Sequence, residues 1–349
     1  MKLIIQIPCL NEEEQLPSML ATLPRKVDGF DIVEWLVIDD GSTDDTAEVA
    51  RAHGVDHIVR FPNNRGLAFG FQAGLDACLK LGADVIVNTD ADNQYDASYI
   101  PALVEPVLTG DAELVIGDRR VQQIDEFSFL KKRLQHLGSW TVRKVSGTDV
   151  PDATSGFRAY SREAALQLVV VNRYTYTLES IIQAGKLHGG VTSVPIDTNE
   201  ATRESRLFSS MWAYVRRNAF VILRVFAQYE PLRFFGFFAA IFFALGLVSF
   251  LPFLVDWFRT GDTSGHLQSI ILGAILILAA VQIAAVAFLA DLITAHRTLS
   301  QRLHDRVRRL ELTQGVEPSY LVSTVEGGAP ADDSAAVDRP EVEREDRIS

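Results

Sequence analysis

The first 120 residues alternate between short apolar runs and segments in which apolar residues recur every three or four positions. Short apolar runs are typical of buried strands, and the wider spacing is typical of helices packed on one face. The pattern predicts strands at residues 2–7, 34–38, 55–60, 85–88 and 113–117, and helices at residues 12–23, 43–53, 67–81 and 98–108. This alternation favours an α/β domain with a mostly parallel sheet and helices on both faces.

A different pattern begins after residue 230. Residues 234–255 and 267–290 contain no charged side chain. Each run is long enough to cross a hydrocarbon core of roughly 30 Å as a helix. A buried core helix is the alternative, but two uncharged runs of this length favour a transmembrane hairpin. The apolar start of the chain is broken at Pro8, too early for a signal peptide, so we expect the anchor to follow the soluble domain.

Arginines predict the orientation of this hairpin, since basic residues gather on the cytoplasmic side. The arginines that flank the two runs are Arg216, Arg217, Arg224 and Arg233 before the first, and Arg297, Arg302, Arg306, Arg308 and Arg309 after the second. The connecting loop carries only Arg259. We therefore expect a multi-pass protein of the cell membrane, with the soluble domain and both termini in the cytoplasm.

The predicted organisation has five parts. They are an α/β domain at residues 1–206, an amphipathic interfacial helix at 207–233, a two-helix hairpin at 234–293, a charged cytoplasmic helix at 294–315 and a disordered acidic tail at 316–349. The helix at 207–233 mixes large apolar side chains with arginines, as helices on a bilayer surface do, although a plain linker helix is the alternative. The charged helix could form a homo-oligomer contact.

Composition narrows the classes of partner and compartment. The formal net charge of −12 argues against non-specific binding of nucleic acid. The two cysteines, Cys9 and Cys78, indicate no disulfide framework, which fits a reducing compartment.

Polar clusters follow three of the predicted strands, at residues 8–13, 39–44 and 90–94. Ligands of parallel α/β sheets bind at the carboxyl ends of the strands, so we expect the three clusters to form one site. Asp90 and Asp92 could share one divalent cation and bridge it to phosphates, although Asp is also an ordinary turn residue.

The cluster at residues 39–44 contains adjacent carboxylates, Asp39 and Asp40, which repel each other. A nucleobase or ribose, which is rich in donors, would use them as acceptors. Ser42 or Thr43 could simply cap the following helix.

Together these motifs resemble the inverting family 2 glycosyltransferases with a GT-A (Rossmann-like) fold, and more closely the polyprenol (dolichol) phosphate hexosyltransferases. The resemblance covers residues 2 to about 210, and the paired apolar runs extend it to about 295. The motifs that carry it are Ile7–Glu12, Ile38–Asp44, Asn64–Leu67, Asp90–Gln94, Asp152–Arg158 and Val194–Ile196.

The resemblance implies roles for individual residues. Those implied to bind the nucleotide sugar are Pro8, Asn11, Glu12, Asp39, Asp40, Gly66, Asp90 and Ala91; those implied to surround Mg²⁺ or Mn²⁺ are Asp90, Asp92 and Gln94. Those implied to bind the lipid phosphate are Arg119, Arg133, Arg203 and Arg206, and the catalytic set is Asp92, Arg119, Arg133 and Asp152. Guanidinium groups suit phosphate because they bind it with two parallel hydrogen bonds.

Several of these roles have structural alternatives. Residues 131–133 could be a solvated helix face or could attract anionic headgroups, and Asp152 could cap the turn at 154–156. This chain departs from the family at these places: the family often has Gly and Lys where this chain has Arg203 and Arg206, and Leu137 stands where the family has a serine.

The reaction that the resemblance implies is inverting transfer of a hexose from GDP-mannose or UDP-glucose to dolichyl or polyprenyl monophosphate at the bilayer. A glycosyltransferase for a lipid-linked oligosaccharide or another glycolipid is the alternative. None of the four tryptophans lies in a Gln-x-x-Arg-Trp motif, which disfavours a processive polysaccharide synthase. Intact Asp90, Asp92 and Gln94 disfavour a non-enzymatic membrane scaffold.

Overall fold

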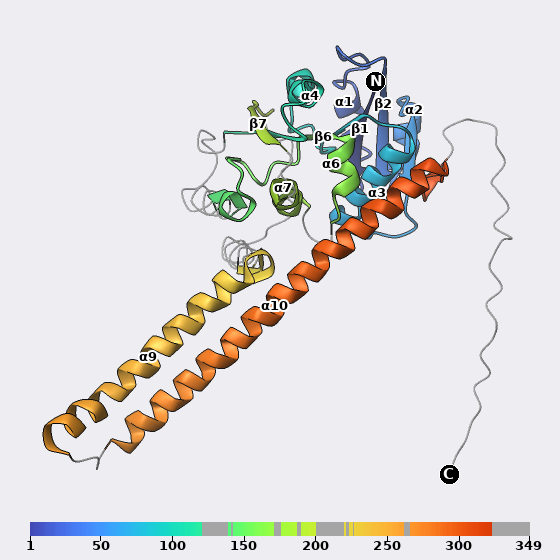
Figure 1. Cartoon of the computed structure of the whole chain (residues 1–349). Coiled ribbons are helices and arrows are strands. Elements are labelled where there is room, and N and C mark those ends of the chain that lie inside the picture. The colour runs from blue at the N-terminus through green and yellow to red at the C-terminus, as the bar shows by residue number, and fades with distance from the viewer. Residues whose placement is uncertain are drawn as a thin grey trace, which may run out of the picture.

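Figure 1 shows the computed structural model of the chain, in which an α/β domain is followed by a long helical hairpin. The residues that the structure describes are 1–120, 139–140, 142–170, 176–186, 190–199, 220, 223–225, 227–261 and 266–322.

Eight strands in the described part of the chain form one sheet, in the order β7-β5-β6-β4-β1-β2-β3-β8. Their bounds are β1 Lys2–Cys9, β2 Ile32–Asp39, β3 His57–Arg60, β4 Val85–Asn88, β5 Leu114–Asp118, β6 Arg158–Ser161, β7 Val191–Pro195 and β8 Leu321–Val322. β4, β1, β2 and β3 are parallel neighbours, and β5 is parallel to β7. β6 and β8 run antiparallel to the strands beside them. The mostly parallel sheet is therefore confirmed.

Side chains of the strands point alternately into two cores, one on each face of the sheet. In β1, Leu3, Ile5 and Ile7 enter one core and Ile4 enters the other. The helices of the first core are α1 (Leu16–Leu20), α2 (Thr46–Ala52) and α4 (Ile100–Leu108), the last preceded by the 3₁₀ turn η1 (Ala97–Tyr99). The helices of the second are α3 (Leu67–Lys80), α6 (Arg162–Gln167) and α7 (Thr177–Lys186).

The first two helices are shorter than predicted. Residues 12–15 and 43–45 are turns rather than the first residues of α1 and α2. Their polar groups bond across to each other, for example from the Asp45 N–H to Glu13 Oε2 at 2.9 Å. Local helical spacing is overridden there because the two loops bind each other.

α9 (Pro231–Thr260) and α10 (Leu267–Thr313) form an antiparallel hairpin that extends away from the sheet (Figure 1). Both helices are long and apolar enough to cross a membrane, by length and composition, and few of their apolar residues are buried inside the protein. The pair packs closely at two glycines. A Cβ on Gly246 would lie 2.7 Å from Ile277, and one on Gly273 would lie 2.7 Å from Phe250. Small residues at such a crossing let helix backbones approach.

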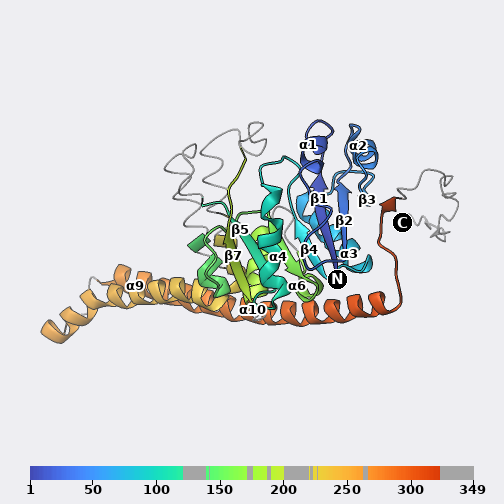
Figure 2. The same ribbon diagram turned by 90° about the horizontal axis from the view of Figure 1, so that it is seen from above.

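The charged helix predicted at residues 294–315 is not a separate element, and that boundary is wrong. α10 continues through it as one helix of 47 residues, roughly 70 Å long. The sequence around residue 294 offers no Pro or Gly to end the helix. Figure 2 shows the second half of α10 lying along the α/β domain.

Basic side chains fasten α10 to that domain. Arg308 is buried, and its Nη1 donates to the carbonyl oxygens of Ala165, Leu166 and Leu168 at 3.3, 3.1 and 2.8 Å. These carbonyls belong to the end of α6, where helices leave acceptors without partners. Nearer the hairpin, Arg297 pairs with Glu179 of α7. Through these contacts, residues 294–313 join the apolar hairpin to the α/β domain.

The tail predicted to be disordered from residue 316 is ordered up to residue 322, which corrects that boundary. Leu321 and Val322 form β8, opposite Val59 and Ile58 of β3. β3 would otherwise be an edge strand with unpaired backbone groups, and β8 covers it (Figure 2). Residues 323–349, and most of the predicted interfacial helix at 207–233, lie outside the described residues.

Candidate active site

The carboxyl ends of β1, β2 and β4 lie side by side, because these strands are parallel neighbours. Cys9 at the end of β1 stands opposite Asp39 at the end of β2, and Gln6 stands opposite Asn88. The three polar clusters therefore meet at one edge of the sheet, as predicted.

The carboxylates gathered there affect the buried Cys9. Burial first, and then the charges of Glu12, Asp39 and other carboxylates, raise the pKa of the Cys9 thiol well above its usual value.

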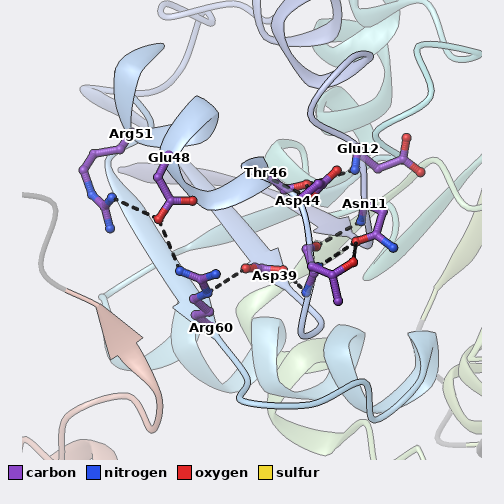
Figure 3. Close-up of polar contacts among 10 residues, drawn as sticks. Asn11, Glu12, Asp39, Asp44, Thr46, Glu48, Arg51 and Arg60 are labelled. Atoms are coloured by element: carbon purple, nitrogen blue, oxygen red, sulfur yellow. Dashed lines mark hydrogen bonds and ion pairs between the residues drawn. The ribbon is translucent and has the colours of Figure 1, made fainter.

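The loop after β1 and the loop after β2 are bonded to each other (Figure 3). Asn11 donates its backbone N–H to Ser42 Oγ at 2.9 Å, and Asn11 Oδ1 accepts from the Thr43 N–H at 2.8 Å. Asn11 has φ 53°, in the left-handed region that asparagine tolerates. Neither Ser42 nor Thr43 caps α2, so that alternative is wrong; Asp44 Oδ1 accepts from the Thr46 N–H at 3.1 Å instead.

The two adjacent aspartates point to different partners, which relieves their repulsion. Asp39 is fully buried, accepts from the Ser42 N–H at 2.8 Å, and has Oδ2 3.1 Å from Arg60 Nε (Figure 3). Asp40 accepts from the backbone N–H groups of Arg65 and Gly66 at 2.7 and 2.8 Å. Burial raises the pKa of Asp40, and these two hydrogen bonds offset that effect only in part.

Gly41 lets the two loops on this side approach each other. Its φ is +73°, and a Cβ there would lie 2.4 Å from the carbonyl carbon of Asn63. Pro8 lies in β1 opposite Ile38, and Ala91 is buried in the core, so each would contribute to a ligand mainly through its backbone. Residues 8–12, 39–42 and 63–66 thus form one continuous polar wall.

Asp90 follows β4 and is the most perturbed carboxyl of the site. Burial first, and then the charge of Asp92, raise the pKa of Asp90 to about 7, while Arg119 and Arg158 act in the opposite direction. Among the described residues, no N–H or O–H donates a hydrogen bond to this carboxylate. A Cβ on Gly156 would lie 2.9 Å from Asp90 Oδ2, so only glycine fits behind it.

This arrangement fits a divalent cation. A desolvated carboxylate beside a second carboxylate is unfavourable alone and favourable with a hard cation between them. The described residues contain no group of three His, Cys, Asp or Glu side chains that could hold a metal, so Asp90 and Asp92 would be the only carboxylate ligands among them. Such a pair leaves coordination positions for the oxygens of a phosphorylated substrate.

The loop of Asp92 and Gln94 is tied to the segment after β7. Asp92 Oδ1 accepts from the Gln94 N–H at 3.2 Å. Asn199 donates its backbone N–H to the Gln94 carbonyl at 2.9 Å and its side-chain amide to the Asn93 carbonyl at 2.9 Å. Residues 92–94 therefore have a fixed backbone.

Arg119, just beyond β5, pairs with Asp152 through two parallel hydrogen bonds. Nε donates to Oδ2 at 2.7 Å and Nη2 donates to Oδ1 at 3.1 Å, and Nη2 also donates to Thr154 Oγ1 at 2.8 Å. Burial alone would raise the pKa of Asp152, but Arg119 and the hydrogen bonds from Thr154 together hold the pKa of that carboxyl below its usual range. Asp152 also accepts from the Thr154 N–H at 3.2 Å, so it caps the turn as well.

These contacts define what Arg119 and Asp152 can do. A guanidinium has five N–H donors, and Nη1 has no acceptor among the described residues. Arg119 therefore keeps two donors for an anion beside Asp90. Asp152 positions Arg119, and its lowered pKa makes it a weak base.

The comparisons with known proteins agree with this geometry. Residues 4–169 match the family model described as glycosyl transferase family 2. The chain is 31% identical over 206 residues to the undecaprenyl-phosphate mannosyltransferase of Micrococcus luteus, covering 56% of this chain and 83% of that protein. It is 30% identical over 201 residues to the dolichyl-phosphate hexose transferase of Haloferax volcanii, covering 56% and 82%.

This chain belongs to glycosyl transferase family 2. Its fold is that of the GT-A enzymes. The glucosyl-3-phosphoglycerate synthase from Mycobacterium tuberculosis, solved with Mn²⁺ and UDP-glucose, superposes with a TM-score of 0.52 at 23% identity, covering 66% of this chain and 79% of that one. The predicted resemblance to the polyprenol-phosphate hexosyltransferase group is confirmed by the named relatives.

The sequence motifs of this glycosyltransferase left two important arginines without a role. Arg60 neutralises Asp39. Arg158 is fully buried and donates to the carbonyl oxygens of Ala153 and Ser155 at 2.9 and 2.7 Å, which folds the segment behind Asp90. The signal was present for both, since Arg60 ends β3 and Arg158 begins β6, and a charge beside buried strand residues needs a partner.

Three predicted site residues of the glycosyltransferase, Arg133, Arg203 and Arg206, lie outside the described residues, so the structure does not test them. The described residues bring together the others: Pro8, Asn11, Glu12, Asp39, Asp40, Gly66, Asp90, Ala91, Asp92, Gln94, Arg119 and Asp152.

Proposed function

We propose that this glycosyltransferase moves a hexose from a nucleotide sugar to a polyprenyl or dolichyl monophosphate, with inversion at the anomeric carbon. The observation that carries the proposal is the juxtaposition of Asp90, a desolvated carboxylate without a hydrogen-bond donor, and Arg119, a guanidinium with two donors to spare. The first suits a metal-bound diphosphate, and the second suits an acceptor phosphate. The names of the two relatives, both lipid-phosphate transferases, support the acceptor.

The donor would lie along the wall made by residues 8–12, 39–42 and 63–66. Asp39 and Asp40 would accept hydrogen bonds from the base and ribose, with Pro8, Asn11, Glu12 and Gly66 around them. Asp90, Asp92 and Gln94 would hold Mg²⁺ or Mn²⁺, which when bound neutralises the charge of the leaving diphosphate. GDP-mannose and UDP-glucose are the proposed donors, and the M. tuberculosis enzyme solved with UDP-glucose and Mn²⁺ supports a donor of this class.

The acceptor phosphate would bind Arg119 Nη1, joined by Arg133, Arg203 and Arg206. A phosphate monoester is already anionic near neutral pH, with its second pKa at about 6, so no strong base is required. Asp152 would hold Arg119 in place, and catalysis would come from positioning and charge neutralisation.

A lipid acceptor would lie in a bilayer, so the site must be held beside one. The hairpin of α9 and α10, whose helices are long and apolar enough to cross a membrane, would hold it there. We propose that it spans the cell membrane, with the catalytic domain and both termini on the cytoplasmic side. Arg302, Arg306 and Arg309 at the domain end of α10, against Arg259 alone in the connecting segment, support this orientation. A homo-oligomer through residues 294–315 stays a prediction.

Sugar transfer by membranes that contain the full-length protein tests the function. Labelled GDP-mannose or UDP-glucose is supplied with Mn²⁺ and dolichyl phosphate, and Asp92→Asn is the control variant. We expect a labelled, organic-soluble product that is absent with the variant. Product formed only with a glycosylated lipid as the acceptor would replace this proposal with a glycolipid glycosyltransferase.

A further inference from the structure

The far end of the described chain lies against the nucleotide side of the site. Tyr320 leads into β8, which pairs with β3 at the outer edge of the sheet (Figure 2). β3 ends at Arg60, the partner of Asp39, and residues 61–66 follow it and hold Asp40. A segment about 260 positions later in the chain than these residues therefore contacts the strand and loop that position both aspartates.

Tyr320 contacts this region through its backbone and its ring. Its carbonyl oxygen accepts from the Arg60 N–H at 3.0 Å. Its ring meets the ring of Phe61 edge-on, with the centroids 5.3 Å apart. The guanidinium carbon of Arg65 lies 5.0 Å from the centroid of the Tyr320 ring, 4.9 Å from that of Phe69 and 5.4 Å from that of Phe61. Three aromatic rings thus surround one cation within the range of cation–π attraction.

The backbone of Tyr320 is itself unusual. Its φ is 62°, in the left-handed region that disfavours residues with a Cβ. Such conformations persist when the surroundings hold them. Here the β8 pairing on one side and the contacts with Phe61 and Arg65 on the other hold Tyr320.

Arg65 connects these contacts to the aspartate beside the donor. Its backbone N–H and that of Gly66 are the two donors to the Asp40 carboxylate. Its exposed side chain would sample many conformations in solvent, but the three rings hold it. Fixing this side chain restricts the backbone that binds Asp40.

We propose that Tyr320 is a positioning residue for the nucleotide half of the donor. Through Arg60 and Arg65, the segment 320–322 holds the loop at 61–66 so that Asp39 and Asp40 present their oxygens to the base and ribose of a nucleoside diphosphate sugar. The identity of this ligand rests on the proposed function. The segment that follows α10 thereby completes the binding site for the nucleotide sugar, at the edge of the sheet formed by β3 and β8.

The test compares three full-length variants in detergent: Tyr320→Ala, Tyr320→Phe and Val316→Ala. Tyr320→Phe keeps the ring and the backbone contact. Val316 lies between the end of α10 and β8 and is exposed, so its substitution is the matched control. UDP and GDP affinities in Mn²⁺ are measured by calorimetry, and hydrogen exchange is followed at the amides of Arg65 and Gly66.

For Tyr320→Ala we expect nucleotide affinity to fall roughly threefold to tenfold, the scale of a lost cation–π contact with its neighbouring ring contact. The two amides should exchange faster, and the KM for the donor should rise while kcat and the KM for the lipid acceptor stay unchanged. Tyr320→Phe and Val316→Ala should behave like the wild-type protein.

Other outcomes separate this inference from the proposed function. Faster exchange with unchanged nucleotide affinity would overturn it, because Tyr320 would then act on stability alone. Unchanged exchange and affinity would also overturn it. If nucleotide binding responds to Tyr320→Ala but the wild-type protein transfers no sugar to polyprenyl phosphate, the inference stands and the proposed acceptor is wrong. A wild-type protein that binds neither nucleotide overturns both.

Discussion

The two sides of the site are built in different ways. On the side proposed for the nucleotide sugar, Asp39 and Asp40 are held largely by backbone N–H groups of the loops that follow β2 and β3. On the side proposed for the lipid phosphate, Arg119 is held by the side chains of Asp152 and Thr154. Hydrogen bonds from backbone N–H groups hold the two aspartates in a shape that tolerates few changes. The side-chain pair with Asp152, by contrast, leaves Arg119 with N–H groups that can bind an anion. The first arrangement suits a rigid nucleotide, and the second suits a phosphate on a flexible lipid.

Because we propose that Asp90 holds the metal ion between the two substrates, its replacement should have the largest effect. Asp90→Asn keeps the shape but removes the charge that a cation requires, and we expect transfer to fall about a thousandfold. Thermal stability should be retained, since no described donor bonds to this carboxylate. Initial rates and Mn²⁺-dependent nucleotide binding are the measurements.

Asp96→Asn is the control for that change. Asp96 lies in the same loop, but its carboxylate only caps η1 by accepting from the Ser98 N–H at 2.8 Å. Transfer by this variant should stay near the wild-type rate. Metal-dependent donor binding that survives in Asp90→Asn would remove Asp90 from the metal site.

On the acceptor side, Asp152→Asn should lower the free energy of unfolding by about 3 kcal/mol at pH 7, because it leaves a buried cation without its counter-charge. The pKa of Asp152 is lowered in the folded protein. Its stabilisation is therefore present above the unfolded-state pKa of about 4 and is lost as pH falls through the lower folded value. Unfolding curves of both proteins at pH 7 and pH 3.5 should show the difference shrinking in acid; a difference independent of pH would contradict the role of this pair.

On the side proposed for the nucleotide sugar, Gly41 can be compared with Gly82, which lies before the start of β4 and away from the site, to separate contact from strain. Gly41→Ala meets the Asn63 backbone, whereas Gly82, with φ +86°, has nothing within 4 Å of a new Cβ. Gly82→Ala should cost about 1 kcal/mol for its backbone conformation, and Gly41→Ala about 3 kcal/mol with weaker nucleotide binding. Thermal unfolding and nucleotide titrations check this, and equal losses would mean that the loops do not interlock.

The smallest expected effect tests the N–H groups of Arg119 that have no acceptor among the described residues. Arg119→Lys keeps the charge but loses the planar fork, so kcat/KM for polyprenyl phosphate should fall about tenfold with nucleotide affinity unchanged. Arg120→Lys is the matched control, because Arg120 forms an exposed pair with Asp197, which contributes little. A loss of nucleotide affinity in Arg119→Lys would mean that this arginine binds the nucleotide sugar and not the lipid phosphate.

Sequence patterns were enough for features set by local spacing and strand direction. Parallel strands bring their carboxyl ends together, so the sequence alone predicts that Asn11, Asp40 and Asp90 lie at one edge of the sheet. The chemistry of Asp90 and Asp92 followed from their residue types. The resemblance to a known family then gave Arg119 its expected role.

Contacts between distant segments could not be read in the same way. Nothing near Arg60 predicts that Tyr320 accepts its N–H, because the pairing of β8 with β3 depends on where α10 ends. The extent of α10 was also missed, since a change from apolar to charged residues marks a change of surroundings and not the end of a helix. Arg308 shows this, as a charged residue buried on the carbonyls of α6.

Because α10 is unbroken, it also sets the distance and the orientation of the catalytic domain relative to the apolar hairpin. If the hairpin crosses a bilayer as proposed, the phase of this one helix decides which way the site faces. One residue inserted between Ala290 and Arg297 would turn the catalytic domain by about 100° and raise it by only about 1.5 Å. Seven inserted residues would restore the facing to within about 20° and lift the domain by about 10 Å. The direction in which the site faces the lipid headgroups would thus depend on the number of residues in α10, because each residue adds a fixed rotation and rise.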